Sequence, residues 1–294
     1  MVVVGSLNVD LLVRVDRRAE AGETIAARGA STLPGGKGAN TAVAAARAGA
    51  PTTLVGAVGA DPAGDGLLAA LRDESVDVSA VAALAGAATG SALVTVTPDG
   101  ESSIVIIAGA NALVDPRTAA AEAGGLGPGD VLASQLEVPL AVVEEVVRAA
   151  TDAGARALLT LSPARQVPLG LLLRLDPLVV NEHEAAVLLG APVDDAEGAA
   201  VALHAKGPRS VVVTAGARGA AVCDASGSTT VTAEHVGAPV DATGAGDCLT
   251  GVLAARLAAG ADLVDALRDA VRAATISITR AGAWPSYPLD EELL

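Results

Sequence analysis

The chain has 294 residues, of which 51% are hydrophobic and 18% charged, and its formal net charge at pH 7 is -15. This length accommodates one large α/β domain or two smaller ones, and the apolar content excludes a disordered chain. The acidic balance disfavours nucleic acid as a partner, because such binding relies on Lys and Arg neutralising phosphates.

The sequence contains no pattern typical of a membrane or secreted protein. The longest uncharged run, residues 78–98, is interrupted by Gly, Ser and Thr, and Ala supplies most of its apolarity. The N-terminus lacks the basic region of a signal peptide. Cys223 and Cys248 fit neither a disulfide framework nor a zinc site. We therefore expect a cytoplasmic protein that binds no membrane.

Strand and helix patterns alternate along most of the chain, which predicts βαβ crossovers and a mostly parallel central sheet flanked by helices. The expected strands cover residues 2–4, 51–58, 131–135, 156–161, 178–181 and 210–214. The expected helices cover residues 41–48, 64–72, 139–152, 182–190 and 194–206.

Two segments depart from this alternation. Residues 91–97 and 103–107 are β-branched or alternating runs joined by Pro98-Asp99-Gly100, which predicts a hairpin. Residues 11–15 and 24–32 supply candidate partner strands. We expect a small β-sheet lid built from about residues 10–34 and 90–108. A later hairpin, 220–224 with 229–232, has the pattern of an ordinary appendage.

The strongest motif is DATGAGD at residues 241–247, which predicts a glycine-rich turn leading into a helix. The N–H groups of Ala245, Gly246 and Asp247 would bind anionic oxygen there, and Gly244 and Gly246 allow close approach of a ligand. Asp247 in the first helical turn would stay ionised and accept a proton from a nearby hydroxyl. Alternatively, the aspartate only complements the helix dipole and the glycines only make a turn.

A second glycine-rich motif, GGKGAN at residues 35–40, is not a Walker A loop, because Lys37 is followed by Gly38 rather than Ser or Thr. The Asn40 amide could bind ligand hydroxyls. The alternative is a tight helix entry with Asn40 as the N-cap.

Polar residues follow several expected strands, at the sheet edge where open α/β folds bind ligands. Arg218, within the TAGARG segment at 214–219, is a candidate phosphate partner. Each of these residues is alternatively a cap or loop residue, and the scattered His183, His204 and His235 do not indicate a metal site. The remaining strand-end residues are Asn8, Asp10, Glu137, Asn181 and Glu184.

Together these motifs resemble the ribokinase-like carbohydrate kinase family over nearly the whole chain. The resemblance implies a single α/β domain, residues 1–294, with a β-lid that also forms a homodimer interface. It implies transfer of the ATP γ-phosphate to a sugar primary hydroxyl, with D-ribose as the expected sugar and Mg²⁺ and K⁺ as cofactors. The segments that carry it are GSLNVD (5–10), PGGKGAN (34–40), AGAN (108–111), SQLEVP (134–139), VNEHE (180–184), TAGARG (214–219), DATGAGD (241–247) and ITRAGAWPS (278–286).

The same resemblance assigns roles to residues of this sequence. Asp247 is the implied catalytic base, with Gly244, Ala245 and Gly246 forming the anion hole. Sugar contacts fall on Asn8, Asp10, Gly36, Lys37, Gly38, Asn40, Glu137 and Asp247. ATP contacts fall on Asn181, Thr214, Ala215, Gly216, Ala217, Arg218, Gly219 and Gly246. Glu184, with Asn181, matches an NxxE pattern associated with Mg²⁺. A monovalent cation site falls on Asp241, Thr243, Ser277, Arg280, Gly282 and Ser286.

Three alternatives remain at this point. The protein could phosphorylate another sugar or a nucleoside, although a chain without Phe has little with which to stack a base. It could also be a non-catalytic sensor of sugar or nucleotide, which the intact Asp247 and its glycine-rich turn disfavour.

Val271 stands where the family often has His or Asn near the adenine, which leaves the purine contact open.

Overall fold

A nine-stranded sheet forms the centre of the computed structural model, which describes residues 1–98 and 102–293. Neighbouring strands are parallel, except that β12 runs antiparallel to both β11 and β13. The predicted mostly parallel sheet is thus confirmed. In pairing order the strands are β13 (Gly227–Val231), β12 (Ala220–Asp224), β11 (Ser210–Thr214), β10 (Leu178–Asn181), β9 (Arg156–Thr160), β8 (Val131–Ser134), β1 (Val2–Val4), β4 (Thr53–Gly59) and β5 (Val81–Leu84).

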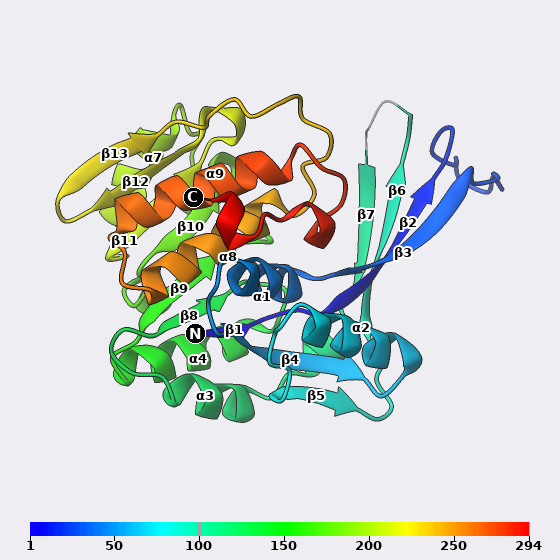
Figure 1. Cartoon of the computed structure of the whole chain (residues 1–294), viewed down its shortest axis with the longest axis horizontal. Coiled ribbons are helices and arrows are strands. Elements are labelled where there is room, and N and C mark those ends of the chain that lie inside the picture. The colour runs from blue at the N-terminus through cyan, green and yellow to red at the C-terminus, as the bar shows by residue number, and fades with distance from the viewer. Residues whose placement is uncertain (99–101, 294) are drawn as a thin grey trace.

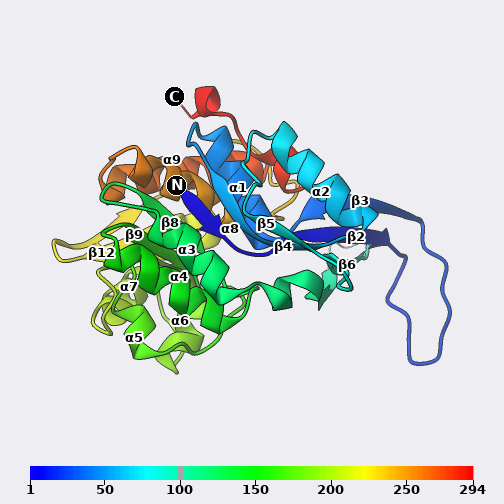
Figure 2. The same ribbon diagram turned by 90° about the horizontal axis from the view of Figure 1, so that it is seen from below.

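Helices cover both faces of this sheet (Figure 2). Successive strand residues point to opposite faces, so that Val3 packs into one core and Val2 and Val4 into the other. The first core contains α1 (Lys37–Arg47), α2 (Pro62–Asp73), α8 (Ala245–Ala258) and α9 (Leu263–Ser277). The second contains α3 (Pro116–Gly124), α4 (Leu140–Asp152), α5 (Leu169–Leu172), α6 (Glu182–Leu189) and α7 (Ala196–His204).

A second sheet projects from one side of this body (Figure 1). Its described strands, in pairing order, are β3 (Gly29–Gly35), β2 (Asn8–Arg14), β6 (Gly90–Val96) and β7 (Ser102–Ile107). Strands β6 and β7 form the expected antiparallel hairpin, whose turn residues Asp99 and Gly100 lie outside the described residues. Strand β2 begins at Asn8, which is expected to bind sugar, and β3 ends at Gly35, immediately before the expected sugar contact Gly36.

Some elements differ from the sequence-based expectation. Helix α1 begins at Lys37 rather than 41, because Gly36 turns the chain with a φ of 94° immediately before it. Helices α3 and α9 and strand β5 were not expected. Both helices carry aspartate N-caps, Asp115 and Asp262, so their start signals were present. None of the helices described has the length and apolarity that a bilayer crossing requires.

Candidate active site

The N-terminus of α8 presents backbone donors beside a buried carboxylate. Gly244 caps this helix with a φ of 74°, and a Cβ there would lie 2.4 Å from the Tyr287 hydroxyl. That hydroxyl donates to the Gly244 carbonyl at 3.0 Å. Only glycine fits this position without displacing the tyrosine.

Two of the three expected anion-binding N–H groups are available. The Ala245 N–H donates to the Ala242 carbonyl at 3.2 Å, so the expectation that it points unpaired into the turn is wrong. A tight turn closes just before the helix and uses this donor. Among the described residues, the N–H groups of Gly246 and Asp247 have no hydrogen-bond partner. Two unpaired N–H groups in the first turn of a helix are suited to binding an anionic oxygen.

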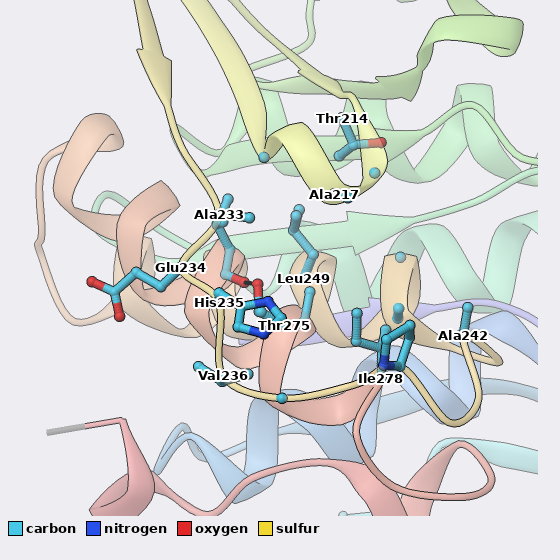
Figure 3. Close-up of a pocket in the computed structure, with 18 residues that line it drawn as sticks. Thr214, Ala217, Ala233, Glu234, His235, Val236, Ala242, Leu249, Thr275 and Ile278 are labelled. Atoms are coloured by element: carbon cyan, nitrogen blue, oxygen red, sulfur yellow. Dashed lines mark hydrogen bonds between the residues drawn. The ribbon is translucent and has the colours of Figure 1, made fainter.

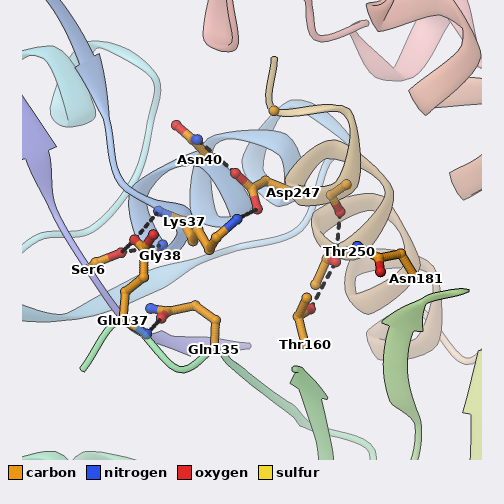
Figure 4. A network of polar contacts seen from close by, with 12 residues as sticks. Ser6, Lys37, Gly38, Asn40, Gln135, Glu137, Thr160, Asn181, Asp247 and Thr250 are labelled. Atoms are coloured by element: carbon orange, nitrogen blue, oxygen red, sulfur yellow. Dashed lines mark hydrogen bonds and ion pairs between the residues drawn. The ribbon is translucent and has the colours of Figure 1, made fainter. Parts of the chain in front are cut away.

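The Asp247 carboxylate lies between two side chains of α1 (Figure 4). Lys37 Nζ is 3.8 Å from its Oδ1, and Asn40 Nδ2 donates to its Oδ2 at 2.8 Å. Burial raises the pKa of Asp247, while Lys37 and Asn40 act to lower it. A carboxylate with a raised pKa is a stronger base than an exposed one, which suits proton abstraction from a hydroxyl.

Asn40 is not the N-cap of α1, because Gly36 occupies that position. Its amide is instead held inside the site. Its Oδ1 accepts a hydrogen bond from Trp284 Nε1 at 2.7 Å, and its Nδ2 donates to Asp247 Oδ2. The interpretation of Asn40 as a helix cap is therefore wrong, and the residue is directed at the proposed base.

Asn8 and Asp10 lie in β2, and Glu137 follows β8 and accepts from the Lys37 backbone N–H at 3.3 Å. Asn8 Oδ1 accepts from Asn111 Nδ2 at 2.8 Å, and Glu137 Oε2 accepts from Ser6 Oγ at 2.6 Å. Neither Ser6 nor Asn111 had been given a role, although both lie within motifs that carry the family resemblance. Both fix the orientation of an expected sugar contact.

Asp10 carries an unsatisfied acceptor. Its Oδ1 is buried without a hydrogen-bond partner among the described residues. Burial raises its pKa to about 6, and the charges of Glu137 and Asp247 add to this effect. A buried acceptor left unpaired costs free energy that a ligand hydroxyl would recover. Three carboxylates thus converge on a place suited to a polyhydroxylated ligand.

Gly246 also lines a mostly apolar cavity of about 400 Å³ (Figure 3). The loop after β11, the start of α8 and the face of α9 that carries Val271 line it, together with the irregular segment 233–239. That segment was not anticipated, since it has no regular pattern. Of the expected nucleotide contacts, Thr214, Gly216, Ala217, Gly219 and Gly246 line this cavity.

Arg218 is not among the residues that line this cavity, although its neighbours Ala217 and Gly219 are. Its side chain is 63% exposed, and its guanidinium pairs with the Glu182 carboxylate at 2.6 Å. In this structure its partner is a carboxylate of α6, so phosphate contact by Arg218 stays a prediction.

A smaller cavity of about 110 Å³ adjoins the larger one, since Thr214 and Gly246 line both. Lys37, Asn181, Glu184 and Asp247 also line it. Asn181 and Glu184 form a capping box, in which each side chain accepts from the other's backbone N–H at 2.8 Å. The arrangement suits a phosphate chain that reaches from the large cavity toward Asp247.

The residues expected to surround a monovalent cation lie on two adjoining segments. Asp241 accepts from Thr243 through Oδ1 and from the Gly282 N–H through Oδ2, the latter at 2.9 Å. The backbone N–H of Asp241 donates to the carbonyl oxygen of Ile278, the residue after Ser277. Burial acts to raise the pKa of Asp241, but these hydrogen bonds outweigh it and lower the pKa. The remaining positions, Arg280 and Ser286, belong to the same C-terminal segment.

Three converging carboxylates, a cavity of about 400 Å³ and unpaired N–H groups at the start of α8 are features expected of a kinase that acts on a small polyhydroxylated substrate. Residues 1–289 match the family described as pfkB family carbohydrate kinase, and the chain belongs to this family. It is 33% identical to the ribokinase of Haemophilus influenzae, with 100% of this chain and 97% of that protein covered. It is 35% identical to the ribokinase of Bacillus subtilis, over 99% and 97% respectively.

The fold of a solved relative agrees equally well. The structure of Arabidopsis thaliana ribokinase complexed with ribose and ATP superposes with a TM-score of 0.90 at 32% identity, covering 99% of this chain and 96% of that one. The resemblance inferred from the motifs is confirmed, and the protein is an ATP-dependent sugar kinase.

Proposed function

We propose that this protein transfers the γ-phosphate of ATP to the primary hydroxyl of D-ribose, giving ribose 5-phosphate. The observation that carries the proposal is the position of Asp247: its carboxylate interacts electrostatically with Asp10 and Glu137, and it lines the small cavity that shares Gly246 with the larger one. The sugar comes from the relatives, which are named ribokinases, one of them solved with ribose and ATP.

The chemistry follows from the residues around the carboxylate. Asp247 takes the proton of the primary hydroxyl as its oxygen forms a bond to the γ-phosphorus, and the bond to the β,γ-bridging oxygen breaks to release ADP. The N–H groups of Gly246 and Asp247 hold the oxygens of the transferring group, where charge develops. Lys37 supplies a positive charge beside the Asp247 carboxylate and the transferring phosphoryl group.

The remaining sugar hydroxyls would be held by polar groups that α1, β2 and β8 position. Asp10 offers its unpaired Oδ1, and Asn8 and Glu137 are oriented by Asn111 and Ser6. Gly36 and Gly38 keep the backbone of the helix entry close to Ser6 and Gly5, so that no side chain fills this space.

The donor set of the small cavity fits Mg²⁺, which binds through one or two carboxylates and substrate phosphates. Glu184 lines this cavity, and its Oε1 takes no hydrogen bond from the described residues. Glu184 and the neighbouring Asn181 would hold the ion. When bound, Mg²⁺ neutralises charge on the β- and γ-phosphates. The oxygen-rich 241–243 and 277–286 segments fit K⁺, with Asp241 balancing its charge.

We also propose that the small sheet is a lid on one α/β domain and the interface of a homodimer. Ile104, Val105, Ile106 and Ile107 in β7 are each 51% to 59% exposed. Successive strand residues face opposite sides, so both faces of this strand carry apolar surface. One face would cover the sugar and the other would pack on a second copy. Cytoplasmic location is consistent with free, buried Cys223 and Cys248.

The decisive experiment incubates the purified protein with ATP, Mg²⁺, K⁺ and D-ribose and measures ADP release against a control without sugar. Parallel reactions with 2-deoxyribose, fructose and adenosine test the alternatives within the family. ADP release no higher than the control with ribose would overturn the assignment. Ribose binding by calorimetry without turnover would instead indicate a sensor.

A further inference from the structure

The single tryptophan of the sequence lies inside the site rather than in a remote core. Trp284 begins the short 3₁₀ helix η3 (Trp284–Ser286) and is 4% exposed. Its indole N–H donates to Asn40 Oδ1 at 2.7 Å, and Asn40 itself is 7% exposed. The hydrogen bond is therefore shielded from water, which makes it stronger and its loss more costly.

The two neighbours of Asn40 allow its amide one orientation. An indole N–H can only donate, and an ionised carboxylate can only accept. Asn40 satisfies both by turning Oδ1 toward Trp284 and Nδ2 toward Asp247, 2.8 Å from its Oδ2. In a flipped amide, Nδ2 would face the Trp284 N–H, donor against donor, and Oδ1 would face the Asp247 carboxylate, acceptor against acceptor.

We propose that Trp284 is a positioning residue for the phosphoryl acceptor site, and that it acts by locking the Asn40 amide in the orientation that faces Asp247. One hydrogen of Nδ2 then holds the base, and the second remains for a hydroxyl of the bound sugar. This inference rests on the proposed function for its catalytic consequence, but the amide lock itself does not.

The backbone that carries Trp284 is tied to the helix that carries Asn40. Arg47, also on α1, donates to the carbonyl oxygens of Trp284 at 2.7 Å and of Tyr287 at 2.9 Å. The same guanidinium makes a two-point pair with Glu74 at 2.7 Å. The indole therefore keeps its place relative to the amide, and a side-chain substitution at 284 leaves these main-chain contacts in place.

Loss of the indole donor has a defined effect on the base. Burial raises the pKa of Asp247, and Lys37 and Asn40 act against it. If the amide can flip, part of the Asn40 contribution is lost and the pKa of Asp247 rises further. The other charged or titratable groups that influence Asp247, or are influenced by it, stay unchanged: Lys37, Glu137, Asp10, Tyr287 and Cys248.

Two substitutions separate the hydrogen bond from the packing. Trp284→Phe keeps an aromatic ring and removes the donor. Trp284→Gln removes the ring and keeps an N–H four bonds from Cα, the same bond count as the indole nitrogen. We expect Trp284→Phe to lower kcat about three- to tenfold and to move the acidic limb of kcat/KM to higher pH, with Trp284→Gln closer to wild type in both. The reverse order would assign Trp284 to packing and overturn the proposal.

The Asn40→Ala background provides the coupling test. If Trp284 acts through Asn40, adding Trp284→Phe to Asn40→Ala leaves the acidic limb where the single Asn40→Ala variant has it. A further displacement of that limb in the double variant would show a route independent of Asn40, which contradicts the proposed lock.

A readout without turnover separates this inference from the proposed function. The ¹³C resonance of the Asp247 side-chain carboxyl, followed against pH, reports its titration directly in the wild type, Trp284→Phe and Trp284→Gln. We expect a higher midpoint in Trp284→Phe only, and equal midpoints would overturn the lock. If the wild type fails to phosphorylate ribose, the proposed function is wrong, while this titration still decides the role of Trp284.

Discussion

Lys37 Nζ lies 3.8 Å from Asp247 Oδ1, in an ion pair that joins α1 to α8 at the wall of the small cavity. Asp247 in turn is the largest influence on Lys37, whose pKa it raises. The pair keeps a cation beside the base while burial acts to neutralise the carboxyl. The net charge of -15 is therefore no obstacle to an anionic substrate, because positive charge is placed locally.

Asp247→Asn removes the proton acceptor and retains the shape of the side chain. We expect kcat to fall by about 10² to 10⁴, the usual contribution of a general base. Circular dichroism and the thermal midpoint should stay close to wild type. Asp265→Asn, in the first turn of α9, is a matched control that should leave kcat unchanged. Near-normal turnover by Asp247→Asn would remove this residue from the role of base.

Asp10→Asn should stabilise the free protein and weaken sugar binding. The pKa of Asp10 is raised to about 6 by burial and by Glu137 and Asp247, so its ionised form opposes folding. The stabilising effect of the substitution is therefore fully present above pH 6, declines as the pH falls toward 4, and is lost well below the ordinary Asp pKa of 3.8, where the carboxyl is protonated in both states.

Denaturant unfolding at pH 8 and pH 4 tests this sign. One pKa unit corresponds to about 1.4 kcal/mol, and partial solvent screening reduces the free energy that the raised pKa implies. We therefore expect the free energy of unfolding of Asp10→Asn to exceed that of the wild type by about 1 to 2 kcal/mol at pH 8. The KM for ribose should rise at the same time. A variant less stable than wild type at pH 8 contradicts the proposed electrostatic role.

Gly244→Ala should damage both folding and catalysis. The positive φ at Gly244 and the 2.4 Å approach of the added Cβ to the Tyr287 hydroxyl force the turn before α8 to move. We expect a loss of about 1 to 3 kcal/mol in unfolding free energy and a lower kcat. Gly66→Ala in α2 meets no neighbouring atom and should be neutral or stabilising. Equal behaviour of the two variants would show that the turn tolerates a side chain.

Replacement of K⁺ by tetramethylammonium should depress turnover if the 241–243 and 277–286 segments bind a monovalent cation. Asp241→Ala should reduce the response to K⁺, because it removes the carboxylate that Thr243 and Gly282 hold. Asp224→Ala breaks a similar aspartate turn, with Ser226, between β12 and β13 and should leave the K⁺ response intact. Turnover indifferent to the cation would count against this site.

Ile106→Arg should convert a dimer into monomers, because it places a charge on the exposed apolar strand β7. Sedimentation velocity measures the change. Leu169→Arg on α5, with an exposed fraction of 60%, tests whether any surface charge has this effect and should leave the mass unchanged. A wild-type protein that sediments as a monomer at micromolar concentration would refute the interface.

Most elements with strong local patterns were predicted, although α3 and α9 were missed despite their aspartate N-caps, and contacts between distant segments were not predicted. The β6–β7 hairpin and the DATGAGD turn have local signals, and both form. The sequence did not indicate that the Ala245 N–H donates to the Ala242 carbonyl. It also did not indicate that residues 233–239 line the large cavity. Neither feature follows a periodic pattern. The bond from Trp284 to Asn40 joins the two ends of the chain, and only tertiary packing brings them together.

That bond also gives the protein a built-in optical probe. With one tryptophan and one tyrosine in the chain, emission excited at long ultraviolet wavelengths comes from Trp284 alone. Its indole is buried and hydrogen-bonded to an amide expected to contact sugar. Sugar binding that reorganises this amide would change the fluorescence of the unlabelled protein, so affinity for each candidate substrate can be titrated without coupling enzymes or dyes.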